Sequence, residues 1–325
     1  GGGESFRTDD FNRENEYVIA RFAMGKKCVR FVSEEFWMMD SGGTFAINEG
    51  FKKQITQEFI GNILLHNQSA IYSCARGNAQ KNLDTNLFNK LKIPLPSLAI
   101  QEQIVAEIEG YQKIIDGARQ VVNNYKPQIK INPDWKMVEL DEVCEIKSGG
   151  TPSRKDIEFW DGDIPWIKTG QIDFIDINNA DEYITKNGLE NSSTRMIPKN
   201  TVLMAMYGQG KTRGKVGILR IQAAINQACA ALLNSQERIS NEYLYYYLIS
   251  QYKNLRILSE NRGGNQPNLN AQLIKEFQIP LPSLEVQQEI VTQIEAEQKM
   301  VNANKKLIEI FEQKTKDKIA EVWGE

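Results

Sequence analysis

Ile93-Pro-Leu-Pro-Ser-Leu98 decides the fold, because the same six residues recur as Ile279-Pro-Leu-Pro-Ser-Leu284, 186 positions later. Over residues 93–109 and 279–295 the two copies share eleven identities in seventeen positions. A repeat of this length predicts one structural unit that occurs twice. The prolines hold an extended approach, and the serine that follows stands where a helix N-cap belongs. Each copy is therefore expected to open a helix.

Apolar residues follow both copies at alternating steps of three and four, which is the spacing of a heptad seam. The first seam runs from Ile100 to Tyr125, and the second from Val286 to Phe311. Neither helix could hold such a stripe in water alone, so the simplest partner for each is the other. The residues expected at the interface of this helix pair are Ile104, Ile108, Tyr111, Ile115 and Val122 in the first helix, and Ile290, Ile294, Val301, Asn304, Ile308 and Phe311 in the second.

Two polar residues interrupt the second seam. Glu297 and Asn304 stand where the first helix has Tyr111 and Ala118. A single buried polar residue can fix the register of a coiled coil, so these two could set that of the helix pair. They could equally face solvent or a partner subunit, and the sequence leaves both interpretations open.

The remaining chain is expected to form two related α/β regions. Strands are predicted at 17–22, 28–32, 135–146, 164–167, 201–206, 216–219 and 224–225, and helices at 59–65 and 243–257. The loop at 77–83 is echoed at 263–269, but the counterpart of Trp135 would precede Gly1, so the first region is expected to be partial. The predicted division is 1–92, partial first region; 93–130, first helix and linker; 131–282, second region; and 283–325, second helix.

Composition limits the classes of protein to consider. The chain has 325 residues, of which 41% are hydrophobic and 25% charged, as in ordinary globular proteins. No run of about 18 apolar residues predicts a membrane span. The four cysteines are far apart and lack a CxxC pair, which suits reduced thiols in a cytoplasm. The net charge is −3, so any site for a polyanion must be local.

One segment has such a local charge. Residues 191–236 contain six basic residues and no Asp or Glu, and three of the six lie in a glycine-rich loop at 208–217. Glycine lets the backbone approach a partner closely, while Lys, Arg, Gln and Thr can meet phosphates and base edges. A solubilising hairpin tip is the alternative. The candidate DNA-binding residues are Gln209, Lys211, Thr212, Arg213 and Lys215, then Arg154, Lys155 and Arg262, with Lys26, Lys27, Arg30 and Arg76 in the first region.

No active site is predicted. The loop ends like a phosphate-binding P-loop, but Ala205 occupies the place of its first glycine, and a strand rather than a helix follows. Asp134, Glu145 and Lys147 imitate a nuclease pattern that is common by chance and here begins in a linker. Metal ligands at a useful spacing are absent from the sequence. We therefore expect no catalytic residue, no metal site and no cofactor.

The doubled helices resemble the conserved regions of type I restriction–modification specificity subunits. The stretch from Trp135-Lys136 to Gly149-Gly-Thr-Pro152, followed by Trp160-Asp-Gly-Asp-Ile-Pro-Trp-Ile167, is similar to the start of that family's target recognition domains. Gly264-Asn-Gln-Pro-Asn-Leu269 is similar to the loop that ends them. The likeness covers almost the whole chain, but the first region lacks the Trp-Lys start of the family. The chain is therefore expected to be a fragment, a natural truncation or part of a fused polypeptide.

The resemblance implies an α+β fold, in which two α/β target recognition domains, the first partial, are separated by two long helices that form an antiparallel coiled coil. It implies that each recognition domain reads one half of a bipartite site on double-stranded DNA, while the helix pair sets the spacing. It also implies docking of methyltransferase (modification) subunits and, in the full complex, of restriction motor–nuclease subunits. Such a subunit is not itself an enzyme, and it works in the cytoplasm.

Two other classes of function stay open at this point. The chain could be the recognition portion of a fused methyltransferase–nuclease, or a nuclease that uses the acidic pair and lysine named above. It could also be a coiled-coil scaffold that binds only protein. Binding to a bipartite DNA would separate the specificity subunit from the scaffold.

Overall fold

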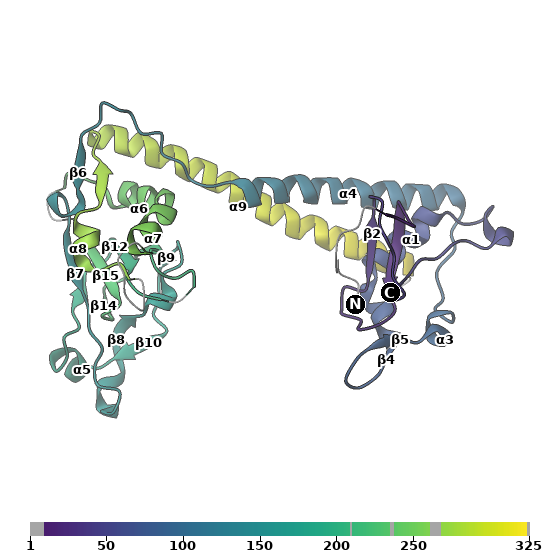
Figure 1. The fold of residues 1–325 in the computed structure, drawn as a ribbon, viewed down its shortest axis with the longest axis horizontal. Helices are drawn as coiled ribbons and strands as arrows, with labels where there is room; N and C mark the ends of the chain where they lie inside the picture. The colour runs from purple at the N-terminus through teal and green to yellow at the C-terminus, as the bar shows by residue number, and fades with distance from the viewer. Residues whose placement is uncertain (1–9, 209, 235–236, 261–267, 324–325) are drawn as a thin grey trace. The chain divides into compact units, whose positions relative to one another are not determined.

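A computed structural model of the chain describes residues 10–208, 210–234, 237–260 and 268–323 (Figure 1). The chain divides into two compact units, which are considered separately. The first unit comprises Gly1–Asn124 with Val301–Glu325, and the second comprises Tyr125–Met300. One long helix, α9, contributes its first part to the second unit and its last part to the first.

The first unit places a small antiparallel sheet of order β2-β1-β3 beside helices. The core between sheet and helices contains Ile19, Val29, Leu64 and Ile71, all at most 4% exposed. The elements are β1 (Glu16–Ala20), β2 (Val29–Val32), β3 (Gly42–Gly43), a 3-10 turn at Glu49–Phe51, α1 (Gln57–His66), α2 (Gln68–Ser73), β4 (Ala75–Arg76), β5 (Asn82–Leu83), α3 (Thr85–Phe88) and α4 (Leu98–Asn124).

The second unit contains a five-stranded sheet of order β7-β15-β12-β13-β9 and a four-stranded sheet of order β10-β8-β14-β11. Its strands are β6 (Met137–Glu139), β7 (Glu145–Ser148), β8 (Trp160–Ile167), β9 (Asp176–Ile177), β10 (Glu182–Ile184), β11 (Met196–Ile197), β12 (Thr201–Ala205), β13 (Val216–Leu219), β14 (Ala223–Ile225), β15 (Cys229–Leu233) and β16 (Gln278–Pro280). Its helices are α5 (Lys186–Glu190), α6 (Asn241–Ser250), α7 (Tyr252–Glu260), α8 (Ala271–Lys275) and α9 (Leu284–Trp323), with 3-10 turns at Leu140–Glu142, Ile157–Phe159 and Thr169–Gln171.

Both faces of the three inner strands, β15, β12 and β13, are buried, which explains why these strands are apolar at almost every position rather than at alternate ones. The edge strands β7 and β9 keep exposed charged residues. On one face, Val202 and Met204 of β12 join a core with Tyr243 and Leu248 of α6. On the other face, Leu203 and Ala205 of β12 join a second core with residues of β8, β14 and β15. The central strand β12 is therefore fixed from both sides.

The two units repeat one design in three dimensions as well as in sequence. In the first unit β1 pairs with β2, and in the second β12 pairs with β13, both as antiparallel hairpins. The amide of Leu83 donates to the carbonyl of Arg21, and the amide of Leu269 donates to the carbonyl of Met206, at 2.8 and 3.0 Å. Helices of ten residues follow, α1 and α6. Within the described part of the first unit, no sheet corresponds to the four-stranded sheet of the second unit, which contains β8.

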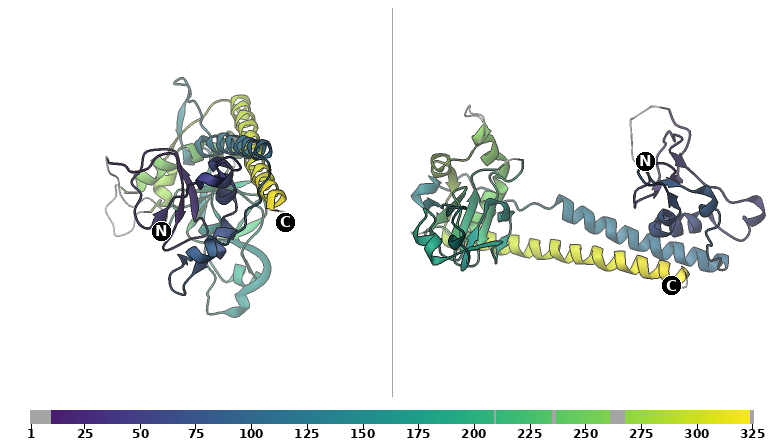
Figure 2. Two further views of the ribbon diagram at one scale, coloured as in Figure 1. Left: turned by 90° about the vertical axis from the view of Figure 1, so that its right-hand side faces the viewer. Right: turned by 90° about the horizontal axis from the view of Figure 1, so that it is seen from below.

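Helices α4 and α9 lie side by side and run antiparallel in the first unit (Figure 2). Lys318 of α9 contacts Glu107 of α4 at 3.1 Å, and Phe311 packs against Tyr111 with ring centroids 5.3 Å apart. Residue numbers that rise along α4 therefore meet numbers that fall along α9. The predicted α+β fold with packed long helices is confirmed.

Several predicted elements differ from the structure in extent. The expected helix at 243–257 is two helices, because the chain turns at Gln251 between α6 and α7. The expected strand at 135–146 is β6 and β7 with a 3-10 turn between them. The second long helix has 40 residues and the first 27, so the second continues well beyond the predicted seam, which ends at Phe311. None of the described helices combines the length and apolar character that a membrane span needs.

Candidate nucleic-acid interface

The basic loop joins β12 to β13 in the second unit. Three glycines give it its shape, since Gly208, Gly210 and Gly214 have φ of 137°, 67° and 83°, which side chains rarely adopt. At its base the amide of Gly214 donates to the carbonyl of Ala205 at 2.9 Å. The tip has exposed Lys211 and half-buried Thr212. Gln209, another candidate in this loop, lies outside the described residues.

Helix α7 holds this loop from one side. The hydroxyl of Tyr252 donates to the carbonyl of Lys211 at 2.5 Å, and the guanidinium of Arg256 donates to the carbonyl of Arg213 at 3.3 Å. The ring of Tyr252 also packs edge-on against Phe174, with centroids 5.2 Å apart. The backbone at Lys211 and Arg213 is thus held by α7.

Acidic residues from outside the basic segment neutralise part of its charge. Arg213 is buried, and its guanidinium lies 3.1 Å from the carboxylate of Glu260. Lys215 forms an ion pair with Asp173. A third basic residue of the segment, Arg220, has two acidic partners in Asp176 and Glu242. The basic residues of the segment whose side chains are exposed are Arg195, Lys199 and Lys211.

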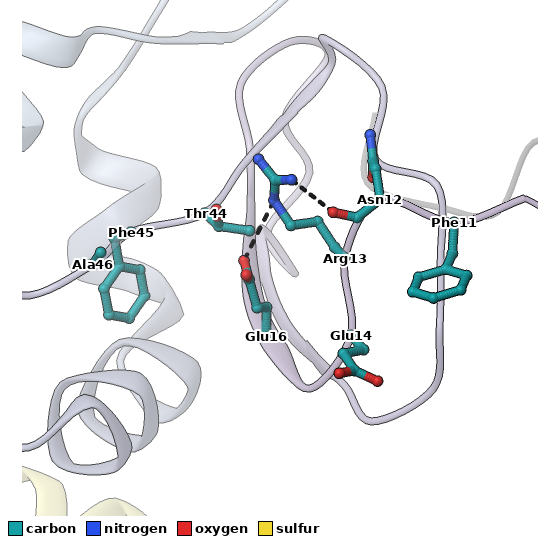
Figure 3. A pocket seen from close by; sticks show the side chains of 8 residues that line it. All are labelled: Phe11, Asn12, Arg13, Glu14, Glu16, Thr44, Phe45 and Ala46. Atoms are coloured by element: carbon teal, nitrogen blue, oxygen red, sulfur yellow. Dashed lines mark hydrogen bonds and ion pairs between the residues drawn. The ribbon is translucent and has the colours of Figure 1, made fainter.

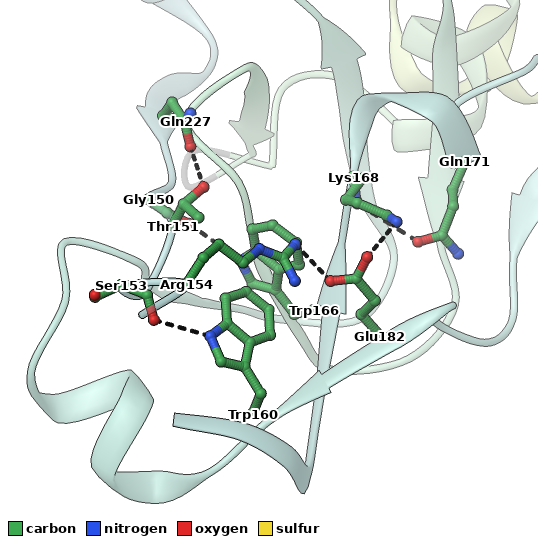
Figure 4. A network of polar contacts seen from close by, with 10 residues as sticks. All are labelled: Gly150, Thr151, Ser153, Arg154, Trp160, Trp166, Lys168, Gln171, Glu182 and Gln227. Atoms are coloured by element: carbon green, nitrogen blue, oxygen red, sulfur yellow. Dashed lines mark hydrogen bonds and ion pairs between the residues drawn. The ribbon is translucent and has the colours of Figure 1, made fainter. Parts of the chain in front are cut away.

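A second group of candidates surrounds Glu182 of β10 (Figure 4). Its carboxylate lies 2.6 Å from the guanidinium of Arg154 and also pairs with the ammonium of Lys168. The hydrogen bond from Lys168, followed by that from Arg154, holds the pKa of Glu182 below its usual range. Arg154 also lies over the ring of Trp160, 3.6 Å from its centroid. Two cations share one carboxylate here, so the cluster keeps a positive charge on a half-exposed surface.

The Gly149-Gly150 pair explains why the motif before this cluster needs glycine. A Cβ on Gly149 would lie 1.8 Å from the carbonyl oxygen of Ile225, and one on Gly150 would lie 2.5 Å from the amide of Thr194. The indole of Trp166 donates to the carbonyl of Gly150 at 3.0 Å. The backbone therefore passes too close to its neighbours for any larger residue.

The remaining DNA-binding candidates lie apart from these two groups. Lys155 is exposed beside Arg154, whereas Arg262 lies outside the described residues. In the first unit Lys26 and Lys27 are exposed in the β1–β2 loop, Arg30 is half-buried on β2, and Arg76 is exposed on β4. Lys26 and Lys27 occupy the hairpin position that corresponds to the basic loop of the second unit.

The first unit also has an open pocket that the sequence does not signal (Figure 3). Its lining mixes charged, polar and aromatic side chains from the segment before β1, the first residue of β1 and the segment after β3. Arg13 lies 3.8 Å from Glu16 and donates to the carbonyl of Asn12 at 2.7 Å. The guanidinium of Arg13 therefore already has partners within the protein. The lining residues are Phe11, Asn12, Arg13, Glu14, Glu16, Thr44, Phe45 and Ala46.

The candidate residues of the helix pair differ in burial. Ile104, Ile108, Ile115, Ile294 and Val301 are at most 7% exposed. Half-buried are Tyr111, Val122, Ile290, Asn304, Ile308 and Phe311. Ile290 packs against the core of the second unit rather than along α4 in the first. The seam continues beyond the predicted residues to Thr315 and Ile319, both buried.

The nuclease-like residues do not form a cluster for a metal. Lys147 pairs with Glu145 at 2.9 Å, while Asp134 is exposed at the start of a turn. Among the residues that the structure describes, no group of three or more His, Cys, Asp or Glu side chains could hold an ion. The four cysteines are all buried and free.

The duplicated units and their long helices define a class of proteins built from two related recognition modules. The chain belongs to the family of type I restriction modification DNA specificity domains, because the family matches residues 18–124 and 132–313. The membership inferred from the doubled helices is thereby confirmed.

Individual proteins that this chain resembles are specificity subunits of type I restriction enzymes. The chain is 28% identical, over 239 residues, to the EcoR124I/EcoR124II type I restriction enzyme specificity subunit of Escherichia coli, covering 67% of this chain and 58% of that one. It is 31% identical, over 186 residues, to the MjaIX specificity subunit of Methanocaldococcus jannaschii, covering 56% and 42%. The chain thus spans about half the length of these curated relatives.

Solved structures share the fold. The S subunit of a type I restriction–modification system from M. genitalium aligns with a TM-score of 0.55 at 16% identity, covering 99% of this chain and 86% of that one. A chain from a study of complex assembly and conformational transition of the type I R-M system aligns with a TM-score of 0.61 at 17% identity, covering 95% and 82%. At these identities the likeness concerns the fold alone.

Proposed function

We propose that this chain is a non-catalytic DNA-specificity subunit, in which each recognition unit reads one half of a bipartite site on double-stranded DNA. Duplication is the observation that carries the proposal. The same hairpin, ten-residue helix and loop precede both long helices. Two related modules joined by a helix pair suit a site with two half-sites and a gap. The chemistry of methylation and cleavage then belongs to partner subunits.

In the second unit we place DNA against the basic loop and the Arg154 cluster. Lys211 is exposed at the loop tip, and the backbone there is held by α7, so binding would order little of the protein. Arg154 keeps half of its side chain exposed while it stacks on Trp160. An exposed cation on a fixed support suits phosphate contact or base readout. Lys26 and Lys27 are the corresponding candidates in the first unit.

The outer faces of the long helices are the proposed docking surface for modification subunits. Apolar side chains stay exposed along them, although an isolated helix pair would place polar residues there. On α4, Ile114 and Val121 are 39% and 44% exposed, and on α9 Met300 and Leu307 are 66% and 36% exposed. These positions correspond in the repeat, so two copies of one partner could dock in the same manner. Restriction subunits would join this assembly.

The test is a selection from random double-stranded DNA by the full chain, alone and with modification subunits. The expected result is one enriched motif with two defined halves separated by a gap of fixed length. Enrichment of a single uninterrupted motif would contradict two-part reading. No enrichment with modification subunits present would overturn the proposal and favour a scaffold that binds only protein.

A further inference from the structure

Two buried glutamines occupy the same position in the two long helices. Gln101 is the fourth residue of α4, and Gln287 is the fourth residue of α9. Both residues are fully buried, with 0% of their surface exposed. They are identical in the sequence repeat. A glutamine is rarely buried completely unless its amide is fully hydrogen-bonded.

Both amides make the same three hydrogen bonds. The Oε1 of Gln101 accepts from the amide of Thr56 at 3.1 Å, and its Nε2 donates to the carbonyls of Gln54 and Pro96 at 2.7 and 2.8 Å. The Oε1 of Gln287 accepts from the amide of Ser240 at 2.8 Å. Its Nε2 donates to the carbonyls of Arg238 and Pro282 at 3.0 and 2.9 Å.

In each set, the glutamine Oε1 completes the N-cap of a ten-residue helix, because it accepts from the amide of the N-cap residue. Thr56 is the N-cap of α1 and Ser240 the N-cap of α6, and each hydroxyl accepts from the amide three residues later. In a capping box the third helical residue is Glu or Gln, and its side chain accepts from the N-cap amide. Here that residue is Phe59 or Tyr243, which packs in the core instead. The long helix supplies the missing acceptor.

Each glutamine therefore links three parts of its own unit. It joins the first turn of the long helix to the chain just before that helix, at Pro96 or Pro282, and to the start of α1 or α6. Apolar contacts alone would let a helix rotate or slide slightly, whereas three directional hydrogen bonds fix one orientation. In the second unit the link lies beside Val291, which is 3% exposed in the core.

We propose that Gln101 and Gln287 are positioning residues that fix the angle between each long helix and its own recognition unit, and thereby determine how sharply the complex selects the gap in its DNA. The second half of this statement rests on the proposed function. If the link only stabilised the fold, its removal would lower the unfolding temperature without changing the preferred geometry. If it positions the helix, its removal changes the angle in protein that is still folded.

The first arm of the test measures the angle in the second unit without DNA. Spin labels at Lys199→Cys and Lys299→Cys, both exposed positions of that unit, report the distance between the recognition sheet and the long helix by pulsed electron paramagnetic resonance. The native cysteines are buried, so labelling favours the introduced ones. Gln287→Leu is expected to broaden the distance distribution. Gln288→Leu, at an exposed neighbour on the same helix, is the matched control and should leave it unchanged.

Gln287→Glu separates a hydrogen-bonding role from a packing role. The introduced carboxylate keeps an acceptor for Ser240 but faces two carbonyl oxygens, which raises the pKa of that carboxyl. Once protonated, it can donate one hydrogen bond again. The broadened distribution of Gln287→Glu should therefore narrow as the pH falls, while that of Gln287→Leu should not. Equal widths in both variants and the parent protein at every pH would overturn the proposal.

The second arm measures DNA selection by the full chain with its modification subunits. Sites with gaps up to two base pairs shorter or longer than the selected one are compared for affinity. Gln101→Leu and Gln287→Leu are each expected to lower the preference for the best gap by about tenfold, which corresponds to ~1.4 kcal/mol. Gln103→Leu and Gln288→Leu are the controls, because both side chains are exposed.

The two arms fail in different ways. If the parent complex selects no bipartite DNA, the proposed function fails, and the spin-label arm still decides whether the glutamine fixes the angle. If the parent complex selects a gap sharply and both leucine variants keep that preference while they remain folded, the glutamines are structural only and the inference is wrong.

Discussion

The guanidinium of Arg213 points away from solvent and pairs with the carboxylate of Glu260 at 3.1 Å, with 6% of the Arg213 side chain and 53% of the Glu260 side chain exposed. Arg213 comes from the basic loop, and Glu260 ends α7. An arginine that reads a base must present its guanidinium to a groove. In this conformation Arg213 instead anchors the loop to α7. Its proposed contact with DNA stays a prediction that can be tested directly.

Arg213→Met is expected to destabilise the second unit by about 1–3 kcal/mol, since a buried charged hydrogen bond is lost while Glu260 can still reach water. Chemical denaturation measures the change. Arg195→Met, at an exposed arginine, is the control and should be close to neutral. DNA affinity should fall equally for all sequences. Relaxed preference at one base pair, by ~1–3 kcal/mol, would instead show that Arg213 moves outward and reads a base.

Lys211 is expected to be the phosphate contact of the same loop. Its side chain is exposed, while its carbonyl is held by Tyr252. Lys211→Ala should weaken binding uniformly and lower the slope of log affinity against log salt by about 0.9, the value for one phosphate. A salt titration by fluorescence anisotropy measures this slope. Lys186→Ala, at an exposed lysine of the same unit, is the control. Lys215→Ala should change the slope less, because Asp173 already pairs with that lysine. Unaltered affinity in both loop variants would exclude this surface.

The sequence predicted the long helices well because their signal is local and repeated. The serine caps, the heptad spacing and the shared residues all act within one helix, and the helices begin at Leu98 and Leu284, directly after each serine. The β12–β13 hairpin was predictable for the same reason, since continuous apolar strands flank a glycine-rich loop. The sequence pattern could not give the length of α9, because its last turns, with Ile319 and Trp323, pack against α1 and α4 beyond the residues that the repeat covers.

The electrostatic state of the loop could not be predicted, because charge partners in a fold are not neighbours in the chain. Counting residues 191–236 finds six basic side chains and no acid. The structure brings Asp173, Asp176, Glu242 and Glu260 to three of these side chains. The glutamine links were equally hidden. Gln101 and Gln287 are an identical polar pair among apolar identities and are buried, whereas Glu109 and Glu295, another identical polar pair of the repeat, are exposed, so identity alone does not single out the glutamines.

The Glu182 cluster predicts a loss of stability in acid. The folded pKa of Glu182 is lowered, chiefly by the hydrogen bond from Lys168, so its contribution is complete above the unfolded pKa and disappears as the pH falls through the folded one. The window lies below about pH 5, given an ordinary Glu pKa of ~4.3. The difference in unfolding free energy between the parent protein and Glu182→Gln should therefore shrink on acidification. A difference that stays constant from pH 7 to pH 3 would show that the ion pairs contribute nothing.

The hydrogen bond of Tyr125 is expected to stabilise the second unit less as the pH rises, which is the opposite pH dependence. Its hydroxyl donates to the carboxylate of Glu297 at 3.1 Å, and burial, followed by this bond, raises the pKa of Tyr125 to about 12. A raised folded pKa gives stability that is complete below the unfolded pKa of about 10 and is lost as the pH rises through the folded one. Tyr125→Phe should cost about 1 kcal/mol near pH 8 and progressively less above pH ~10. Unfolding curves at both pH values measure this. If Tyr125→Phe lowered the free energy of unfolding equally at both pH values, the hydrogen bond from Tyr125 to Glu297 would not contribute to stability.

Glu297 and Asn304 both interrupt the second seam, but their surroundings in the structure differ. The carboxylate of Glu297 accepts hydrogen bonds from Tyr125, the residue after α4, and from Gln293 of α9 itself. Asn304 is half-buried and also engaged in a contact. Asn304→Leu is expected to keep the fold but to loosen the choice of register, which cysteine cross-linking between α4 and α9 can detect. Cross-links at the parent positions alone would contradict a role in register.

The length of the helix pair should set the gap between the half-sites. Removing about four residues, one turn or ~6 Å, would shorten a DNA gap by about two base pairs at ~3.4 Å each, but it would also rotate the apolar seams away from each other. Paired deletion of a whole heptad, residues 112–118 of α4 and 304–310 of α9, keeps the seams aligned and removes ~10.5 Å. The preferred gap should then shorten by about three base pairs. The measurement repeats the DNA selection with the shortened chain. Deletion of one heptad from α4 only is the control, because it shifts the residues that meet across the pair by one heptad on one side of the deletion. If the doubly deleted protein folds, docks its modification subunits and still selects the original gap, then the helix pair does not set the spacing.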